Sequence, residues 1–203
     1  MSSQLSKETI EKVVDFHGHS CPGLSIGIRA SELARRELGD LPDTRLVCIT
    51  ETDMCGVDAI QYLTGCTFGK GNLIHRDHGK MAFTFFDRES GQGFRSILKP
   101  EARGEAGEEL SQLSRKIAAG TANQEEKQHV QALRQQMQER IMTADLDALF
   151  ETMAPLERMP RRARVLESLA CEECGEATME SRTRRFSGKT LCQPCFDKVE
   201  QKV

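Results

Sequence analysis

Residues 16–23 read Phe-His-Gly-His-Ser-Cys-Pro-Gly, and this stretch lies between two segments with helical patterning. Ser6 is a suitable N-cap for the first segment, and Gly18 is a suitable end for it, because glycine tolerates a left-handed backbone. Pro22 suits the first turn of the second segment, since its missing N–H would be unpaired there, and Gly39 should end that helix. The stretch therefore predicts two helices joined by a loop that carries two histidines and a cysteine.

The residues that follow predict strands and a further helix. Residues 45–51 form a short, β-branched segment that is typical of a strand, with Cys48 inside it as core filling. Residues 57–64 have a helical pattern. Residues 81–87 and 93–98 flank a polar, glycine-containing turn and predict a hairpin. We therefore expect helices and strands to be mixed in the first half of the chain.

From residue 103 to residue 142 the chain becomes rich in Glu, Gln, Lys, Arg and Ala. Two apolar stripes recur there at helical spacing, and they consist of Leu110, Leu113 and Ile117 and of Val130, Leu133, Met137 and Ile141. Gly120 can close the first helix, and residues 121–124 have capping-box spacing for the second. We expect a helical hairpin with a structural or oligomerising role, and another short helix near residues 144–153.

The composition limits the class of protein. The 38% of hydrophobic residues suffice for a core, and no apolar run approaches the roughly 18 residues that span a bilayer, so we expect no membrane association. The first residues lack the basic cluster and apolar stretch of a secretory signal, so the expected location is the cytoplasm. The formal charge of −3 argues against electrostatic binding of nucleic acid by the protein surface as a whole.

The eight cysteines are unevenly distributed. Four lie in the first third of the chain, four lie near its end, and residues 67–170 contain none. In a reducing compartment, spaced cysteines more often bind metal or do chemistry than form disulfides. The distribution suggests two cysteine-bearing units joined by a spacer.

The second group of cysteines has the spacing of a zinc finger. Cys171-Glu-Glu-Cys174 and Cys192-Gln-Pro-Cys195 are two C-x-x-C pairs, which supply four thiolates to a tetrahedral zinc ion. Strand-like residues 178–186 and 190–191 flank a turn, and a helix is expected over residues 196–202. This order favours a treble-clef finger. Four thiolates close the coordination shell, so this zinc would fold the unit and leave catalysis to other residues.

The arginines of the finger do not identify the partner that the finger binds. Arg182, Arg184 and Arg185 can contact phosphate, but residues 155–203 have ten basic residues against eight acidic ones. A solvated face is therefore the simpler interpretation. Nucleic acid stays an alternative partner of the finger.

The first group of cysteines indicates a second metal site. In an extended chain, His17, His19 and Cys21 place three donors on one side, and a helix dipole favours the Cys21 thiolate. A fourth ligand must come from elsewhere, and Cys55 also precedes a helix, with Asp58 nearby. The alternative is that one histidine caps a helix and the cysteines are buried.

Two other histidines and a glycine-rich loop do not predict a site. Three residues separate Gly65 from Gly69 and a glycine follows Lys70, whereas a P-loop has four residues between its glycines and Ser or Thr after its lysine. His75 and His78 can reach one ion from a helical turn, but we expect a surface or hydrogen-bonded role for them.

Four stretches resemble the FmdE family, which is named after the E subunit of molybdenum or tungsten formylmethanofuran dehydrogenase. They are residues 16–23, 55–60, 65–72 and 79–83, and residues 163–195 are similar to the treble-clef finger that many members append. The resemblance implies an α+β core with a metal-binding cleft, and dimers in which the subunits embrace each other.

The resemblance also implies site residues. The family's paired histidines and cysteine fall on His17, His19 and Cys21, and its second cysteine falls on Cys55. The residues expected to surround these ligands are Asp58, Cys66 and Lys70. A soft divalent ion such as zinc would occupy the cleft.

We therefore expect three parts in this chain. Residues 1–102 form an α+β core with the His/Cys cleft, residues 103–154 a helical hairpin, and residues 155–203 a four-cysteine treble-clef zinc finger. The first functional hypothesis is a homodimeric accessory or small catalytic component of a molybdenum or tungsten oxidoreductase. The alternative is a regulatory or adaptor protein whose finger binds a partner protein or nucleic acid.

Overall fold

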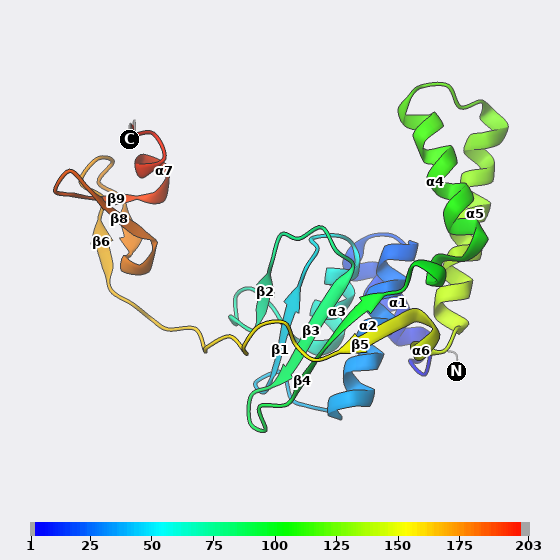
Figure 1. The fold of residues 1–203 in the computed structure, drawn as a ribbon, viewed down its shortest axis with the longest axis horizontal. Coiled ribbons are helices and arrows are strands. Elements are labelled where there is room, and N and C mark those ends of the chain that lie inside the picture. The colour runs from blue at the N-terminus through cyan, green and yellow to red at the C-terminus, as the bar shows by residue number, and fades with distance from the viewer. Residues whose placement is uncertain (1–2, 200–203) are drawn as a thin grey trace. The chain divides into compact units, whose positions relative to one another are not determined.

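The structure is a computed structural model that describes residues 3–199 (Figure 1). Two compact units make up the chain, Met1–Arg162 and Ala163–Val203. The first unit mixes helices and strands, and the second consists of short strands around a cysteine cluster, as expected for an α+β core with an appended finger. No helix within residues 3–199 is long and apolar enough to cross a bilayer.

A five-stranded sheet forms the centre of the first unit, in the order β2-β1-β3-β4-β5. Its strands are β1 (Leu46–Thr50), β2 (Leu73–His75), β3 (Ala82–Asp87), β4 (Gly93–Leu98) and β5 (Phe150–Met153). β1 pairs in parallel with β2, and the other neighbours are antiparallel, with Cys48 opposite Phe85 on β1 and β3. The expected strand over residues 45–51 and the expected hairpin are therefore confirmed.

The helices of the first unit begin and end largely where their caps predict. They are α1 (Lys7–His17), α2 (Pro22–Leu38), α3 (Gly56–Thr64), α4 (Gly104–Ala118), α5 (Gln124–Thr143) and α6 (Leu146–Leu149), with the short 3-10 helix η1 (Pro100–Arg103). Ser6 accepts the N–H of Thr9, and Gly18 ends α1 with a φ of 91°. Gly39 ends α2.

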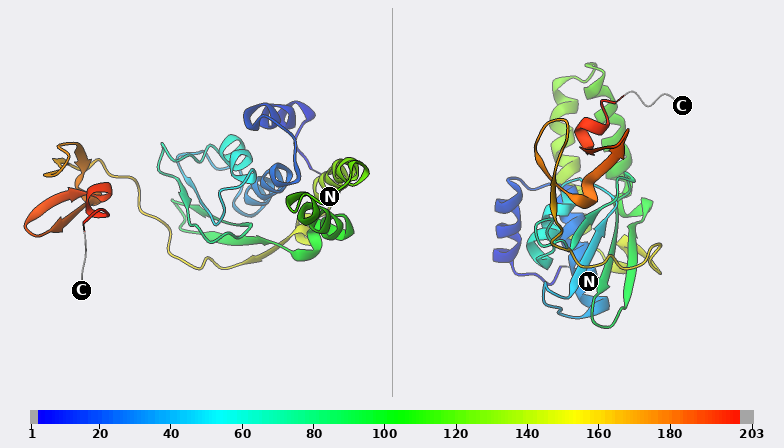
Figure 2. Two further views of the ribbon diagram at one scale, coloured as in Figure 1. Left: turned by 90° about the horizontal axis from the view of Figure 1, so that it is seen from above. Right: turned by 90° about the vertical axis from the view of Figure 1, so that its left-hand side faces the viewer.

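Opposite faces of the sheet are covered differently. α2, α3 and α5 pack on one face, where the buried residues include Ala30, Leu33, Phe83, Phe85, Met137 and Ile141. Figure 2 shows α1, α2 and α3 on this side and the extended segment after β5 on the other. There Met159 packs on Val47, Ile49 and Phe86, because alternate residues of a strand face opposite ways.

Two sequence expectations about the helical hairpin region were wrong. The helix expected near residues 144–153 stops at Leu149, and Phe150–Met153 pairs with β4, which tertiary contacts favour over local helical preference. The capping box of α5 lies at Asn123 and Glu126 and not at residues 121–124. Thr121 instead bonds the carbonyl of Lys116 at the end of α4.

The apolar stripes of the hairpin differ in burial. Val130, Leu133, Met137 and Ile141 on α5 are buried, as expected. On α4 only Leu113 of the expected stripe is fully buried, and Ile117 is 39% exposed. The hairpin therefore has its own small core near its outer end and joins the main core through α5.

The second unit contains two strand pairs and a short helix. Its elements are β6 (Ser168–Ala170), β7 (Ala177–Met179), the 3-10 turn η2 (Glu180–Arg182), β8 (Thr183–Phe186), β9 (Lys189–Cys192) and α7 (Gln193–Phe196). The expected strand over residues 178–186 is thus interrupted by η2. The helix expected over residues 196–202 was wrong in its described part, since α7 spans Gln193–Phe196 and residues 197–199 form a turn; residues 200–202 lie outside the described residues.

Candidate metal centres

Close packing of glycines brings the amino ends of α2 and α3 together. A Cβ atom on Gly27 would overlap the backbone of Gly56, and one on Gly56 would lie 2.9 Å from the carbonyl oxygen of Gly23. The two helices therefore contact each other backbone to backbone. Their N-cap residues are Cys21 and Cys55, and a Cβ on Gly23 would lie 3.8 Å from each of the two sulfur atoms.

Four donors converge at this point and form what we call the His/Cys cluster. One ligand atom from each of His17, His19, Cys21 and Cys55 lies within 4.8 Å of the others. Tetrahedral zinc, with bonds of about 2.0 to 2.3 Å, holds its ligands about 3.3 to 3.8 Å apart. Small side-chain rotations are therefore enough to bring these atoms onto one ion.

His17 has different surroundings at its two ring nitrogens. Nδ1 lies 2.7 Å from Oδ2 of Asp58, and because a carboxylate only accepts hydrogen bonds, Nδ1 carries the proton. In the neutral ring Nε2 is then the nitrogen with the free lone pair, and it is buried without a hydrogen-bond partner among the described residues. A buried acceptor without a partner is costly unless something binds it. A carboxylate behind a histidine is the usual arrangement in metal sites.

Asp58 is itself held in place. It lies in the first turn of α3, and Nε2 of Gln61 donates to its Oδ1 at 3.1 Å. Asp58 is therefore the one expected neighbour of the ligands that the structure places against one of them.

The ionisation of the two cysteine thiols would also be favoured by a bound cation. Burial, and then the hydrogen bond and charge of Cys21, raise the pKa of the Cys55 thiol. Cys21 accepts the N–H of Leu24 at 3.3 Å. Two adjacent thiolates repel each other without a positive partner, and a bound metal ion would relieve that repulsion. The donor set therefore suits a soft divalent metal.

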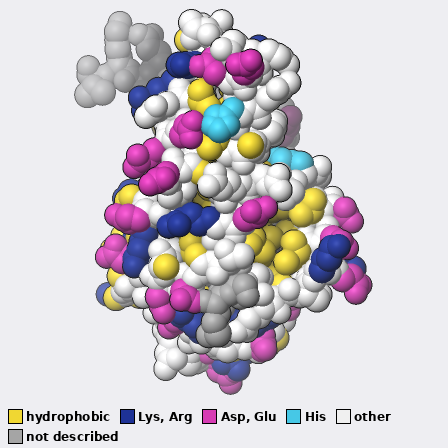
Figure 3. All heavy atoms as spheres, turned by 90° about the vertical axis from the view of Figure 1, so that its right-hand side faces the viewer, with side chains coloured by type: hydrophobic (Ala, Val, Ile, Leu, Met, Phe, Trp, Pro, Cys, Tyr) yellow, Lys and Arg dark blue, Asp and Glu magenta, His cyan; other side chains and the backbone are white. Residues whose placement is uncertain are grey.

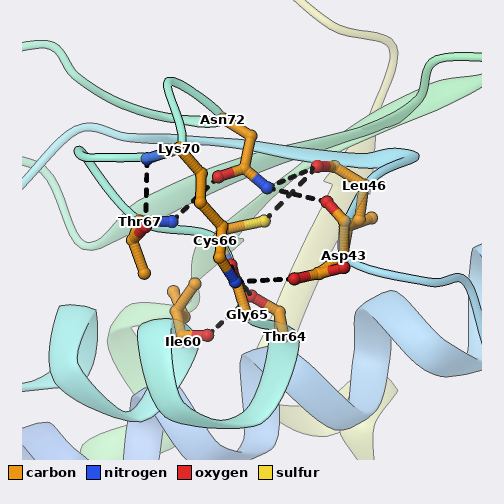
Figure 4. A network of polar contacts seen from close by, with 9 residues as sticks. All are labelled: Asp43, Leu46, Ile60, Thr64, Gly65, Cys66, Thr67, Lys70 and Asn72. Carbon is orange, nitrogen blue, oxygen red and sulfur yellow. Dashed lines mark hydrogen bonds and ion pairs between the residues drawn. The ribbon is translucent and has the colours of Figure 1, made fainter.

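Cys66 and Lys70 lie elsewhere, beyond the carboxyl end of α3, as Figure 4 shows. The Cys66 thiol is fully buried and donates to the carbonyl of Leu46 at 3.6 Å. Lys70 pairs with Asp43 at 2.6 Å and donates to the carbonyl of Gly65. The structure therefore does not bring these two residues to the His/Cys cluster, because α3 separates its two ends by about 13 Å.

The network around Cys66 fixes the glycine-rich loop. The Asn72 side chain donates to the carbonyls of Asp43 and Leu46 and accepts the N–H of Thr67 (Figure 4). These bonds tie the loop to the start of β1. The loop is thus held in place by hydrogen bonds of its own side chains. This agrees with its sequence, which lacks the pattern of a phosphate-binding P-loop.

His75 and His78 do not share a helical turn. His75 ends β2, and His78 follows in a loop, where its Nδ1 lies 3.1 Å from Oε2 of Glu51. Glu51 in turn forms a buried ion pair with Arg95. The hydrogen-bonded role expected for His78 is confirmed.

The finger unit gathers a second cluster. One sulfur atom from each of Cys171, Cys174, Cys192 and Cys195 lies within 4.8 Å of the others. Backbone N–H groups, that of Cys174 first, lower the pKa of Cys171 to about 6, whereas the hydrogen bond with Cys192 and burial raise the pKa of Cys195 to about 12. The Cys171 thiolate therefore forms readily, whereas that of Cys195 needs a cation. This geometry fits structural zinc.

Sequence reasoning missed the glycines that build the first cluster. Gly23 and Gly27 are four residues apart on α2, a spacing that allows close approach of helices. That spacing was visible in the sequence, but only the structure shows that these two glycines contact Gly56.

Comparisons with known proteins agree with this architecture. The family model described as FmdE, Molybdenum formylmethanofuran dehydrogenase operon, matches residues 16–151. A model described as Prokaryotic dksA/traR C4-type zinc finger matches residues 164–201.

Two individual proteins are similar to this chain. A probable S-adenosyl-L-methionine-binding protein from Archaeoglobus fulgidus is 31% identical over 194 residues, which are 89% of this chain and 50% of the relative. The chain thus spans about half the length of that curated relative. The crystal structure of a tungsten formylmethanofuran dehydrogenase FmdE-like protein from Syntrophus aciditrophicus has a TM-score of 0.60 and 24% identity, and the match covers 97% of this chain and 94% of the other. At that identity the likeness shows the fold.

Proposed function

This chain belongs to the FmdE family of metal-binding proteins, and we propose that its His/Cys cluster holds one soft divalent ion, with zinc as the best match to the donors. We propose further that the protein is an accessory or small catalytic component related to the E subunit of molybdenum or tungsten formylmethanofuran dehydrogenase. The finger would hold a second, structural zinc ion through its four cysteines.

One observation carries this proposal. Nε2 of His17 is buried without a partner among the described residues, while Asp58 holds the opposite nitrogen of the same ring. Nε2 of His75 is also buried without a partner among the described residues, but His75 belongs to neither donor group, whereas His17 has three other metal donors within 4.8 Å. The neighbouring donors in the His/Cys cluster supply what the ring lacks, since all of them can bind the same ion.

The cluster also has a side that faces solvent. His19 is exposed, whereas His17, Cys21 and Cys55 are half-buried. If the exposed His19 stayed unbound, an ion held by His17, Cys21 and Cys55 would keep an open position, where it would polarise a carbonyl group or lower the pKa of a bound water molecule. The protein's own residues would hold the ion, orient His17 through Asp58, and leave the solvent side accessible to a small ligand.

Substitution of cobalt for zinc tests the open position. Cobalt(II) in a cysteine and histidine site has visible absorption that changes when a ligand is added. We expect azide to change the spectrum of the loaded full-length protein, and we expect no change in a Cys21→Ser variant, in which only the finger is filled. An azide-insensitive spectrum in the unmodified protein would contradict the open position.

S-adenosyl-L-methionine is a candidate ligand of this cluster, because the similar protein from Archaeoglobus fulgidus carries its name. The aligned residues cover most of this chain, so the binding region of that relative can lie within the shared part. Calorimetric titration of the zinc-loaded chain tests this, and binding that survives in the Cys21→Ser variant would place the ligand away from the cluster.

A homodimer is the assembly that we propose. The α4–α5 hairpin extends from the core, and its exposed side includes Ile117 (Figure 1). Figure 3 shows apolar side chains gathered at the level where the hairpin meets the core. A second copy that packed along the hairpin would remove this surface from water. Light scattering coupled to size exclusion should give twice the mass of one chain, and the mass of a single chain would contradict the dimer.

The adaptor function remains the second proposal, because a closed shell of four cysteines leaves the finger with a surface but no open coordination site. Its partner would be a protein, such as a molybdenum or tungsten oxidoreductase, or nucleic acid. The eight free thiols favour the reducing cytoplasm as the location. Binding to nucleic acid that is lost in a Cys174→Ser variant but kept in a Cys21→Ser variant would support the adaptor function.

A further inference from the structure

A groove with an excess of basic side chains lies where α4 leaves the sheet of the first unit. Its volume is about 630 Å³, and it is lined by residues just before β3, at the end of β4, in η1 and along α4. The charged residues that line it are Lys80, Lys99, Arg103, Arg115 and Glu108. We call this groove the basic groove. The whole chain has a formal charge of −3, so the positive charge here is a local feature.

Most of this positive charge is available to a partner. Lys80, Arg103 and Arg115 are exposed, and none of them forms an ion pair within the described part of the chain. Elsewhere on α4 the situation differs, since Lys116 pairs with Glu126 at 2.6 Å. Lys99 is the basic residue of the groove that is already engaged, because it donates to the carbonyl oxygen of Asp147 at 2.8 Å.

The two arginines are too far apart for one small anion. Twelve positions separate Arg103 from Arg115 along α4, which corresponds to about 18 Å of helix. Gly107 and Ser111 line the groove between them, and a Cβ on Gly107 would overlap the Cβ of Arg103. Glycine is therefore needed for Arg103 to keep its place in the groove. A ligand that contacts both arginines must carry several anionic groups along its length.

The rest of the lining distinguishes between kinds of polyanion. Leu98 is buried, and Met81 and Ile97 are half-buried, so the groove has an apolar floor below its exposed basic side chains. None of the described lining residues is aromatic, whereas single-stranded nucleic acids bind by stacking bases on aromatic side chains. An apolar floor with a charged rim is typical of surfaces that bind polypeptide.

We propose that the basic groove docks a short acidic segment of a partner protein, whose carboxylates pair with Lys80, Arg103 and Arg115 while its apolar side chains pack on the floor. An extended chain covers the distance between the two arginines with about five or six residues, at about 3.3 Å per residue. The inference does not depend on the metal in the His/Cys cluster. It adds a protein-docking surface on the first unit, apart from the surface of the finger.

A synthetic peptide tests this docking. The probe is a short fluorescein-labelled peptide that alternates glutamate with leucine, and its matched control has glutamine in place of every glutamate. In fluorescence anisotropy with the zinc-loaded full-length protein, we expect the glutamate peptide to bind at least about 10-fold more tightly than the glutamine peptide, because several exposed ion pairs are lost together. Its affinity should fall as salt is added. This comparison needs no protein variant.

Two variants of equal charge locate the binding. Arg103→Glu/Arg115→Glu should weaken binding of the glutamate peptide by at least about 10-fold, because attraction becomes repulsion at both positions. Lys127→Glu/Arg134→Glu changes the net charge equally at exposed positions of α5 outside the groove, and it should bind the peptide like the unmodified protein.

Four outcomes would overturn the proposal. Absence of binding, or equal affinity for the glutamate and glutamine peptides, would show that the groove does not select acidic segments. Equal losses in the two variants would show attraction to the overall charge and not to the groove. Tighter binding of oligothymidylate or inorganic triphosphate that is lost only in the Arg103 and Arg115 variant would assign the groove to phosphate ligands. A dimer that dissociates only in that variant would assign it to a subunit interface.

Discussion

At the scale of single residues, His17 connects structure to the proposed chemistry. Its Nδ1 bond to Asp58 leaves Nε2 as the nitrogen whose lone pair can bind a metal ion. The sequence identified both residues as candidates for the metal site, but it could not show that their side chains are in contact, because they are 41 residues apart. The contact depends on how α1 and α3 pack, which is a tertiary property.

Removal of the Asp58 carboxylate should weaken metal binding without abolishing it. We expect Asp58→Ala to lower zinc affinity at the cluster by about 10- to 100-fold, which is the usual effect of losing the group that orients a histidine ligand. Competition with a chromophoric chelator measures this affinity. Asp43→Ala is the control, since Asp43 pairs with Lys70 beyond the other end of α3. Equal affinities in the Asp58 variant and the unmodified protein would show that Asp58 does not position His17.

The buried pair of Glu51 and Arg95 should make stability depend on pH. The hydrogen bond from Arg95, and then that from His78, lower the pKa of Glu51. A lowered folded-state pKa gives stability that is present above the unfolded value of about 4.3 and lost as pH falls through the folded value. We expect Glu51→Gln to cost about 3 to 5 kcal/mol at pH 7, because Arg95 is left unpaired, and less in acid. Denaturant unfolding of both proteins at pH 7 and pH 4 should show the difference shrinking, and a constant difference would contradict this account.

At the scale of secondary-structure elements, the helix ends could be predicted from local sequence, whereas the pairing of strands that are distant in the sequence could not. Ser6, Gly18 and Gly39 act within one helical turn, so their sequence positions sufficed to place helix ends. β5 depends on β4, which lies some fifty residues earlier, and no local pattern in residues 150–153 shows that pairing. Cys66 was misplaced for a related reason, since the sequence does not show which end of α3 faces the histidines.

The glycine contact between α2 and α3 is the element-scale feature on which the His/Cys cluster depends. We expect Gly27→Val to separate the helices, to destabilise the protein by about 1 to 3 kcal/mol as overpacking does, and to remove the metal from this cluster. Thermal unfolding and metal analysis check both effects. Gly69→Val is the control, because a Cβ there meets no atom within 4 Å. Full metal content in Gly27→Val would show that the helices need not touch.

At the scale of the whole molecule, the two compact units differ in what stabilises them. The first has a sheet covered by helices, whereas the core cluster of the second, within residues 163–199, contains four buried hydrophobic residues, three of them cysteines. A unit this small rarely folds on apolar burial alone, so the finger needs its metal. The C-x-x-C spacing predicted this part of the molecule well, because the ligands and the fold are encoded in the same short segment.

Chelation should therefore affect the two units differently. We expect excess EDTA to collapse the amide NMR signals of residues 168–196 to unfolded positions, while the signals of β1, β3 and α2 stay dispersed. The reason is that the main core buries large apolar side chains without a metal. Retention of the finger signals after complete zinc removal would contradict a metal-dependent fold.

The central claim is that two separate metal centres share no ligand, and elemental analysis of the purified full-length protein tests it most directly. The account predicts two zinc ions per chain, one for each cluster, and one ion in either Cys21→Ala or Cys174→Ala. The double variant should contain none. Two ions retained in Cys21→Ala, or a single ion in the unmodified protein that is lost in Cys174→Ala, would show that the His/Cys cluster binds no metal.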